Sequence, residues 1–193
     1  MQIISGPVYS PRVHFEAPPA ARVPADMQEF LAFFEQTRDD ATFDPVARAG
    51  IAHLYFVSIH PFEDGNGRVG RAVAECALSQ ALGHPSLTGI SSVIAQRRGD
   101  YYDALERASR DNEVTEWLRY FGDVVLAGQA RSLRFVRFLV EKTRFLDRLR
   151  SALNPRQEKA LLRILREGPD GFQGGLSAGN YMTITGAPPA TAR

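Results

Sequence analysis

Residues 60–71 of this 193-residue chain read His-Pro-Phe-Glu-Asp-Gly-Asn-Gly-Arg-Val-Gly-Arg. Proline, aspartate, asparagine and glycine dominate the first half, which predicts a loop over residues 60–66 and a helix from about Gly67. Another helix is expected before the loop, because Asp44-Pro45 is a helix-start signal and apolar residues follow it at helical spacing to about Ile59. The stretch therefore joins two helices through a tight polar loop.

The loop has the residues of an anion site. Gly65-Asn66-Gly67 places successive backbone N–H groups at the start of the second helix, where glycine allows close approach and the helix dipole favours phosphate. Arg68 and Arg71 lie three positions apart, on one face of the first helical turn. Their guanidinium groups suit paired hydrogen bonds to phosphate oxygens.

Two further side chains indicate the chemistry. Asp64 offers hard oxygen ligands, and Mg²⁺ is usually held by one or two carboxylates together with substrate phosphates. His60 lies at the C-terminal end of the first helix, where a neutral imidazole can take a proton from an incoming hydroxyl. These residues suit phosphoryl or nucleotidyl transfer, which depends on positioning and charge stabilisation. A purely structural interhelical loop is the alternative.

The remainder of the chain is expected to be mainly α. Two short apolar stretches on either side of Ser5-Gly6-Pro7 predict an N-terminal hairpin. Apolar spacing predicts further helices, including a long stretch that carries Trp117 and Phe121, and Gly128 is expected to interrupt it. His53 is expected in the core. Cys76 is likewise expected to be buried, as a small apolar residue.

The pattern His-Pro-Phe-x-Asp-Gly-Asn-Gly-Arg-x-x-Arg, filled here by His60 through Arg71, resembles the signature of the Fic (filamentation-induced-by-cAMP) family. The resemblance implies a Fic-type helical bundle over residues 1–150, with a β-hairpin flap in residues 1–24. Residues 154–193 resemble the winged-helix, helix-turn-helix-like tail of one Fic subgroup. A short helical appendage with a partial winged helix is therefore expected there.

The resemblance also implies a function. Fic adenylyltransferases (AMPylators) transfer AMP from ATP to a Tyr, Thr or Ser hydroxyl of a target protein and release pyrophosphate. Tyr101 and Tyr102 are expected near the nucleotide, although one helix directs them about 100° apart, so at most one faces it squarely. The other roles carried over are His60 as general base, Asp64 as Mg²⁺ ligand, Gly65, Asn66 and Gly67 on the α-phosphate, Arg68 and Arg71 on the β- and γ-phosphates, and Phe62 as the buried anchor of the loop.

Other functions stay open. A Fic-fold enzyme can remove AMP or transfer another phosphate-containing group. Kinase-like relatives replace the glycine at position 67 by lysine and lack the final arginine, so Gly67 and Arg71 favour AMP transfer. A DNA-binding regulator acting through residues 154–193 is the third alternative, with DNA as a weak partner because that segment lacks the rest of its third helix and any wing. A homodimer is also left open.

Composition narrows the setting. Lys and Arg number 23 against 22 Asp and Glu, a net charge of +1, so nothing demands a nucleic-acid or anionic-membrane partner. No apolar run approaches bilayer length, and one cysteine excludes an internal disulfide, so a cytoplasmic location is expected. The Ser/Thr-x-x-x-Glu-Gly/Asn motif of inhibitory Fic helices is absent from this sequence. Restraint is therefore expected from an inhibitory helix or antitoxin outside this chain.

Overall fold

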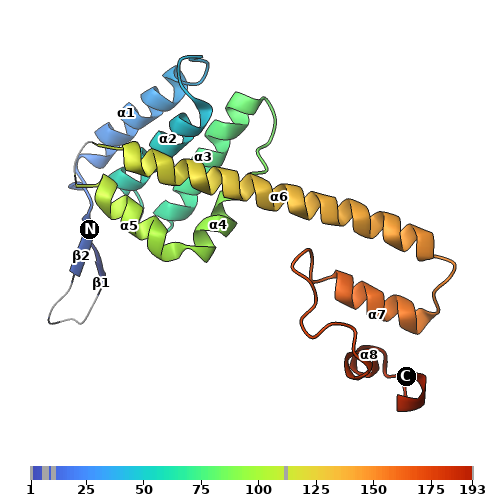
Figure 1. Ribbon diagram of the computed structural model, residues 1–193. Helices are drawn as coiled ribbons and strands as arrows, with labels where there is room; N and C mark the ends of the chain where they lie inside the picture. Colours follow the sequence, from blue (N-terminus) through green and yellow to red (C-terminus); the bar gives the residue numbers. More distant parts are fainter. Residues whose placement is uncertain (1, 6–8, 10–11, 111–112, 193) are drawn as a thin grey trace. The chain divides into compact units, whose positions relative to one another are not determined.

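The computed structural model describes residues 2–5, 9, 12–110 and 113–192, and in these the chain is mainly helical, as expected (Figure 1). No helix in those ranges is long and apolar enough to cross a membrane. Two compact units, Met1–Ala130 and Arg131–Arg193, divide the chain. The elements are β1 (Gln2–Ser5), β2 (Arg12–Glu16), α1 (Val23–Gln36), α2 (Pro45–Ile59), α3 (Asn66–Leu82), α4 (Ile90–Gln96), α5 (Arg98–Ala108), α6 (Thr115–Leu149), α7 (Pro155–Leu165), α8 (Ala178–Thr185) and the 3₁₀ turn η1 (Pro189–Thr191).

The two N-terminal strands pair antiparallel, with Gln2 opposite Glu16 and Ser5 opposite Arg12. The register shifts between Ile3 and Ile4, which is the mark of a bulge or irregularity in the ladder. The turn expected at Gly6-Pro7 lies outside the described residues. The strand pair predicted from the two apolar stretches is therefore present in the backbone.

Helices α2 and α3 form the antiparallel pair that carries the motif. Asp44 begins α2 by accepting hydrogen bonds from the N–H groups of Val46 and Ala47, at 3.0 and 2.8 Å. Gly70 lets α3 approach closely, because a Cβ there would lie 2.8 Å from Val57 Cγ1. Close packing of these two helices holds the connecting loop between two rigid ends.

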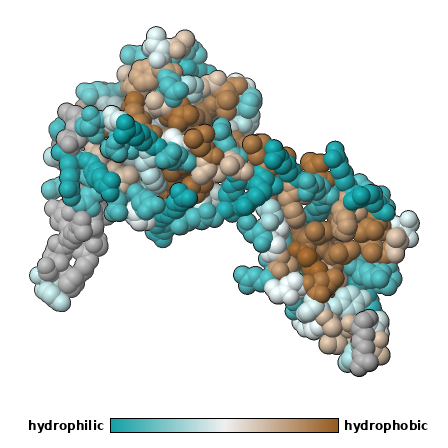
Figure 2. Space-filling view, in the orientation of Figure 1, coloured by the Kyte–Doolittle hydropathy of each residue, from teal (hydrophilic) through white to brown (hydrophobic). Residues whose placement is uncertain are grey.

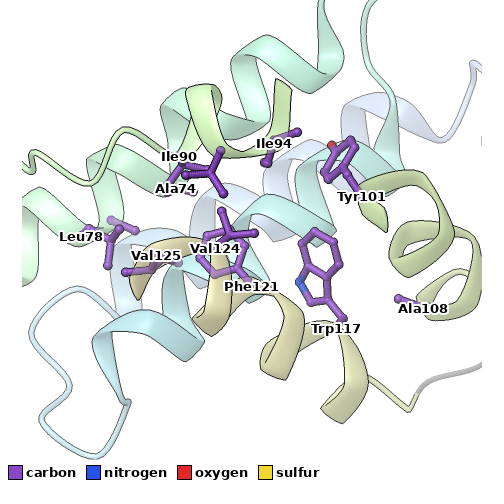
Figure 3. Close-up of a cluster of buried hydrophobic side chains, with 13 residues drawn as sticks. Ala74, Leu78, Ile90, Ile94, Tyr101, Ala108, Trp117, Phe121, Val124 and Val125 are labelled. Atoms are coloured by element: carbon purple, nitrogen blue, oxygen red, sulfur yellow. The ribbon is translucent and has the colours of Figure 1, made fainter. Parts of the chain in front are cut away.

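The core of the first unit gathers around α6. Trp117 and Phe121 are almost fully buried and pack with Tyr101 of α5 and side chains of α3 and α4 (Figure 3). The Trp117 indole N–H donates to the Gly50 carbonyl of α2 at 2.8 Å. His53 of α2 stacks on the indole with ring centroids 5.5 Å apart, so the expectation of a core histidine is confirmed.

Gly128 does not interrupt α6, contrary to the expectation from sequence. The helix continues through it because the glycine serves a tertiary contact: a Cβ there would lie 1.7 Å from the Thr88 carbonyl oxygen. Glu75 of α3 holds the segment before α4 at that place, since it accepts hydrogen bonds from the hydroxyls of Ser86 and Thr88 at 2.8 Å each and from the Ile90 N–H at 3.2 Å. Helix propensity at this glycine is outweighed by packing.

Cys76 is exposed, so the expectation of a buried cysteine is wrong. Its neighbours Ala74, Ala77 and Leu78 form the inward face of α3. With 100° between successive residues, Cys76 points away from the face that Ala74 and Leu78 define.

The second unit is smaller, and it divides from the first within α6. The sequence-based division at residues 150–154 stays a prediction. Asn154 caps α7 in a capping box with Gln157. Lys142 of α6 donates to the Leu165 carbonyl at 3.1 Å. Residues 131–192 contain helices and a 3₁₀ turn but no strand, so this part of the chain shows no wing.

Candidate active site

His60 ends α2 in an unusual conformation. Its backbone is left-handed, with φ 52° and ψ 56°, and it is the one non-glycine residue with positive φ in the part of the chain that the structure describes. A residue with a Cβ pays a small energetic cost there, and such positions concentrate at functional sites. The His60 N–H still donates to the Phe56 carbonyl at 3.3 Å, so the residue is tied to the helix end. The imidazole is thus carried on a defined turn.

Asn66 closes the loop with its side chain. The Phe62 N–H donates to Asn66 Oδ1 at 3.0 Å, and Asn66 Nδ2 donates to the Phe62 carbonyl at 2.7 Å. The amide is buried and both of its ends are occupied by the loop backbone. Any contact of Asn66 with a phosphate therefore falls to its backbone N–H.

Phe62 is not the buried anchor that the resemblance implied, because its side chain is 50% exposed. Its ring does contact the core edge, with a centroid 6.2 Å from that of Phe56. The two hydrogen bonds of Asn66 fix the backbone of residue 62 instead. A polar side chain, and not an apolar one, thus holds the loop.

The start of α3 presents free donors. Gly65 precedes the helix with φ 89°, a conformation that favours glycine, and no side chain caps the helix there. The first helical hydrogen bond runs from the Val69 N–H to the Gly65 carbonyl at 2.9 Å. Helix geometry therefore leaves the N–H groups of Asn66, Gly67 and Arg68 without acceptors inside the helix. This is the arrangement that binds phosphate at a helix N-terminus.

Asp64 and Arg68 form an exposed pair beside these donors. Arg68 Nη2 lies 2.9 Å from Asp64 Oδ2, with the two side chains 72% and 91% exposed. Asp64 Oδ1 accepts from the Gly65 N–H at 2.6 Å. Exposed ion pairs contribute at most about 1 kcal/mol. Both groups are therefore available to a ligand that brings opposite charge to each.

Arg71 is held from two sides. Its Nε donates to the hydroxyl of Ser91 on α4 at 3.1 Å. Its guanidinium also lies close to Gly67 and to the Tyr101 hydroxyl. A Cβ on Gly67 would lie 3.4 Å from Arg71 Nη1 and 3.9 Å from the Tyr101 hydroxyl oxygen. The guanidinium is thus placed against the first turn of α3, beside the free N–H groups.

The two tyrosines of α5 differ as the helix geometry predicted. Tyr101 is 4% exposed, and its hydroxyl lies 3.0 Å from His53 Nε2. Tyr102 is 50% exposed, with its ring centroid 5.3 Å from that of Tyr101. The structure therefore brings Tyr101 to Arg71 and leaves Tyr102 accessible to a ligand.

Burial sets the charge states behind Arg71. It lowers the pKa of His53 to about 4, with a smaller effect in the same direction from the Arg71 charge. Burial also raises the pKa of Tyr101 well above its usual value, against an opposing effect of the nearby Arg71. At neutral pH both groups are uncharged.

Sequence reasoning did not single out Ser91 or His53 as parts of the site. Nothing in the local sequence marks Ser91, because its role depends on where α4 packs against α3. His53 carried one signal, its spacing of seven residues from His60 on the same helix. Both residues belong with the motif only through tertiary structure.

Comparisons with known proteins show which sequences and structures this chain is similar to. The sequence model of the Fic/DOC family matches residues 4–78, which include β2, α2 and the motif. The chain is a Fic family protein. It is 33% identical to protein adenylyltransferase Fic of Aedes aegypti over 103 residues, 52% of this chain and 19% of that protein. The protein of the same name from Drosophila melanogaster is 32% identical over 103 residues, 52% of this chain and 20% of that protein.

A solved structure shares the fold. The Fic family protein from Desulfovibrio desulfuricans G20 superposes with a TM-score of 0.53 and 25% identity, over 94% of this chain and 48% of that chain. The chain spans about a fifth of the length of the curated relatives it matches and about half of the solved chain.

Proposed function

We propose that this Fic protein is an adenylyltransferase that moves AMP from ATP to a Tyr, Thr or Ser hydroxyl of a target protein. The observation that carries the proposal is the start of α3, where three N–H groups without helical acceptors lie beside Arg68 and Arg71. His60 stands at the end of the preceding helix. Phosphate binding and a base for the acceptor hydroxyl thus come from the two ends of one loop.

The residues divide the reaction between them. His60 takes the proton of the acceptor hydroxyl as its oxygen forms a bond to the α-phosphorus. The bond from the α-phosphorus to the bridging oxygen breaks, and pyrophosphate leaves. The N–H groups of residues 66–68 stabilise charge on the α-phosphate, while Arg68 and Arg71 bind the β- and γ-phosphates. Tyr102 offers an exposed ring for contact with adenine.

The residues at this site fit a Mg²⁺ ion that the protein would bind together with the substrate phosphates. Asp64 is an exposed carboxylate beside the proposed phosphate positions. No group of three or more His, Cys, Asp or Glu side chains able to hold a metal occurs among the described residues. A single carboxylate with substrate phosphates is the usual arrangement for Mg²⁺, which supplies neutralisation of phosphate charge when bound. Asp64 is therefore the proposed protein ligand.

The β1–β2 pair is the proposed docking element for the target. An extended peptide can add to an exposed strand edge and gain main-chain register without strict sequence demands. We expect Val13→Pro to spare ATP binding and to reduce target modification, because proline removes an N–H from the strand. Equal loss of ATP binding would show that the strands support the fold instead.

Restraint by a separate helix or antitoxin remains part of the proposal. Within the described residues Arg71 donates to Ser91, lies beside the Tyr101 hydroxyl and forms no ion pair with a carboxylate. We therefore expect the purified chain to modify itself or a target, in a cytoplasmic setting, without an activating substitution. Silence with bound ATP would reveal an internal restraint.

The position of a radioactive label in ATP tests the proposal. Incubation with α-labelled ATP should label protein, whereas γ-labelled ATP should not, and mass spectrometry should find AMP on a hydroxyl side chain. Transfer of the γ-label would indicate a phosphotransferase instead. Loss of AMP from a pre-modified protein, without incorporation from ATP, would indicate an AMP-removing enzyme.

Arg71→Ala should weaken ATP binding, because each hydrogen bond to a charged group contributes about 1.5–3 kcal/mol.

A further inference from the structure

We propose that Ser91 and Tyr101 are positioning residues for Arg71, and that His53 orients the Tyr101 hydroxyl. The inference rests on the proposed function for the role of Arg71 toward phosphate. It also revises the role of Tyr101, which the family resemblance implied was a nucleotide contact. These side chains form a polar network that runs from Arg71 of α3, through Tyr101 of α5, to His53 in the core.

The geometry places each member. Arg71 Nε donates to Ser91 Oγ at 3.1 Å, and the guanidinium lies beside the Tyr101 hydroxyl, since a Cβ on Gly67 would be 3.4 Å from Arg71 Nη1 and 3.9 Å from the Tyr101 oxygen. That hydroxyl lies 3.0 Å from His53 Nε2. Ser91 and Tyr101 come from different helices, α4 and α5. Two independent elements therefore hold one side chain.

The donors and acceptors of these side chains determine the direction of the hydrogen bonds in the network. A guanidinium only donates, so the Tyr101 oxygen faces Arg71 as an acceptor. His53 Nε2, 3.0 Å away, accepts the Tyr101 proton when it is the unprotonated nitrogen of a neutral imidazole. His53 Nδ1 lies against Gly70 of α3, where a Cβ on that glycine would be 3.2 Å from it. His53 thus fixes how the Tyr101 hydroxyl faces Arg71.

The burial of these polar side chains indicates that they do more than fill space in the core. His53 is fully buried, and Tyr101 lies among Trp117 and other apolar side chains (Figure 3). Polar groups cost free energy to bury, and phenylalanine would fill either place without that cost. Among the described residues, Arg71 is the charged group of the motif that acts on both the hydroxyl and the imidazole. Fixing that guanidinium leaves its remaining N–H groups directed at a ligand.

Calorimetric titration of ATP and AMP into variant proteins tests the assignment. Tyr101→Phe and Ser91→Ala should each weaken ATP binding about five- to tenfold, the loss of one hydrogen bond. AMP binding should stay unchanged, because AMP lacks the phosphates that Arg71 is proposed to bind. In an Arg71→Ala background neither substitution should weaken ATP binding further, since the group they position is gone.

Matched controls come from neighbouring residues. Tyr120→Phe removes the hydroxyl of another tyrosine that packs on Trp117, and that hydroxyl has no hydrogen-bond partner among the described residues. Ser92→Ala removes a hydroxyl of α4 that donates to the Gly89 carbonyl at 2.8 Å. Both should bind ATP as the unsubstituted protein does. Unchanged ATP binding in Tyr101→Phe and Ser91→Ala, or equal losses in the Arg71→Ala background, would overturn the assignment.

A second measurement separates this inference from the proposed function. The Nε–H signal of Arg71, identified by its loss in Arg71→Lys, reports positioning in the free protein through its rate of exchange with water. We expect slow exchange in the unsubstituted protein and faster exchange in Ser91→Ala and Tyr101→Phe. Slow exchange in a protein that binds no ATP would remove the proposed function and leave the positioning intact. Fast exchange in every form would overturn the positioning.

Discussion

The two compact units bury their apolar side chains to different extents. Residues 1–130 enclose large side chains such as Trp117, Phe121 and Ile90. In residues 131–193 the buried apolar side chains are alanines, Ala160 and Ala187, among those that the structure describes. Apolar side chains gather instead on the surface of that unit (Figure 2). The exposed set is Leu133, Phe135, Val136, Leu139, Val140, Leu162 and Leu176.

This difference explains where a site can be built. Phosphate recognition needs donors held within a fraction of an ångström, and that precision comes from packed neighbours. The residues proposed for it, His60, Asp64, Arg68 and Arg71, all lie in the first unit, on or between helices that pack tightly. Catalysis and stability are both expected to follow this division.

The largest effect is expected at His60. His60→Ala should lower AMP transfer by at least about a hundredfold, the usual contribution of a general base. ATP binding should persist, because the imidazole is proposed to act on the acceptor hydroxyl and not on the nucleotide. Initial rates of label incorporation and titration with ATP measure the two effects. Leu176→Ser, in the second unit, serves as the comparison and should leave the rate unchanged; a similar loss there would break the division.

Trp117 should dominate the stability of the first unit. Trp117→Ala removes a buried indole and its hydrogen bond to Gly50, so it should lower the free energy of unfolding by about 3–5 kcal/mol. Leu162→Ala, at a half-exposed position of α7, should cost less than about 1 kcal/mol. Urea denaturation followed by circular dichroism compares them. Comparable losses would mean that packing in the second unit contributes as much to the free energy of unfolding as packing around Trp117 does.

Acid should weaken the first unit through His53. Its pKa is about 4 in the folded protein and near 6.5 when unfolded. As pH falls from 6.5 to 4, the unfolded chain binds a proton that the folded protein does not, so stability falls by about 3 kcal/mol. In His53→Phe this part of the decline should vanish. His84→Asn, at an exposed histidine, controls for the loss of one histidine, and an unchanged profile in His53→Phe would contradict the assignment.

The smallest effect is expected from a surface ion pair of the second unit. Arg134 Nη2 lies 2.9 Å from Asp170 Oδ1, with both side chains more than half exposed. Asp170→Asn should change the free energy of unfolding by less than about 1 kcal/mol. Thermal unfolding at low and high salt measures it. A larger loss would show that this unit relies on charge pairs where the first relies on its core.

Local features of the sequence were sufficient for the elements around the motif. The start of α2 at Pro45, its end beside His60 and the start of α3 next to Gly67 agree with the predicted helices. Capping side chains, glycine and proline act over a few residues, so their effect is visible in a short window. The motif residues His60 and Asp64 and the two arginines were likewise identified from one short stretch of sequence.

Tertiary structure decided what each side chain does. Phe62 is exposed and Asn66 is turned inward because the amide satisfies the loop backbone. Gly128 continues α6 because the segment before α4 packs against it. Ser91 and Tyr101 meet Arg71 only where α3, α4 and α5 come together. The sequence by itself determined the helices and the motif through short-range propensities and capping, whereas burial and hydrogen bonds between distant residues assembled the site.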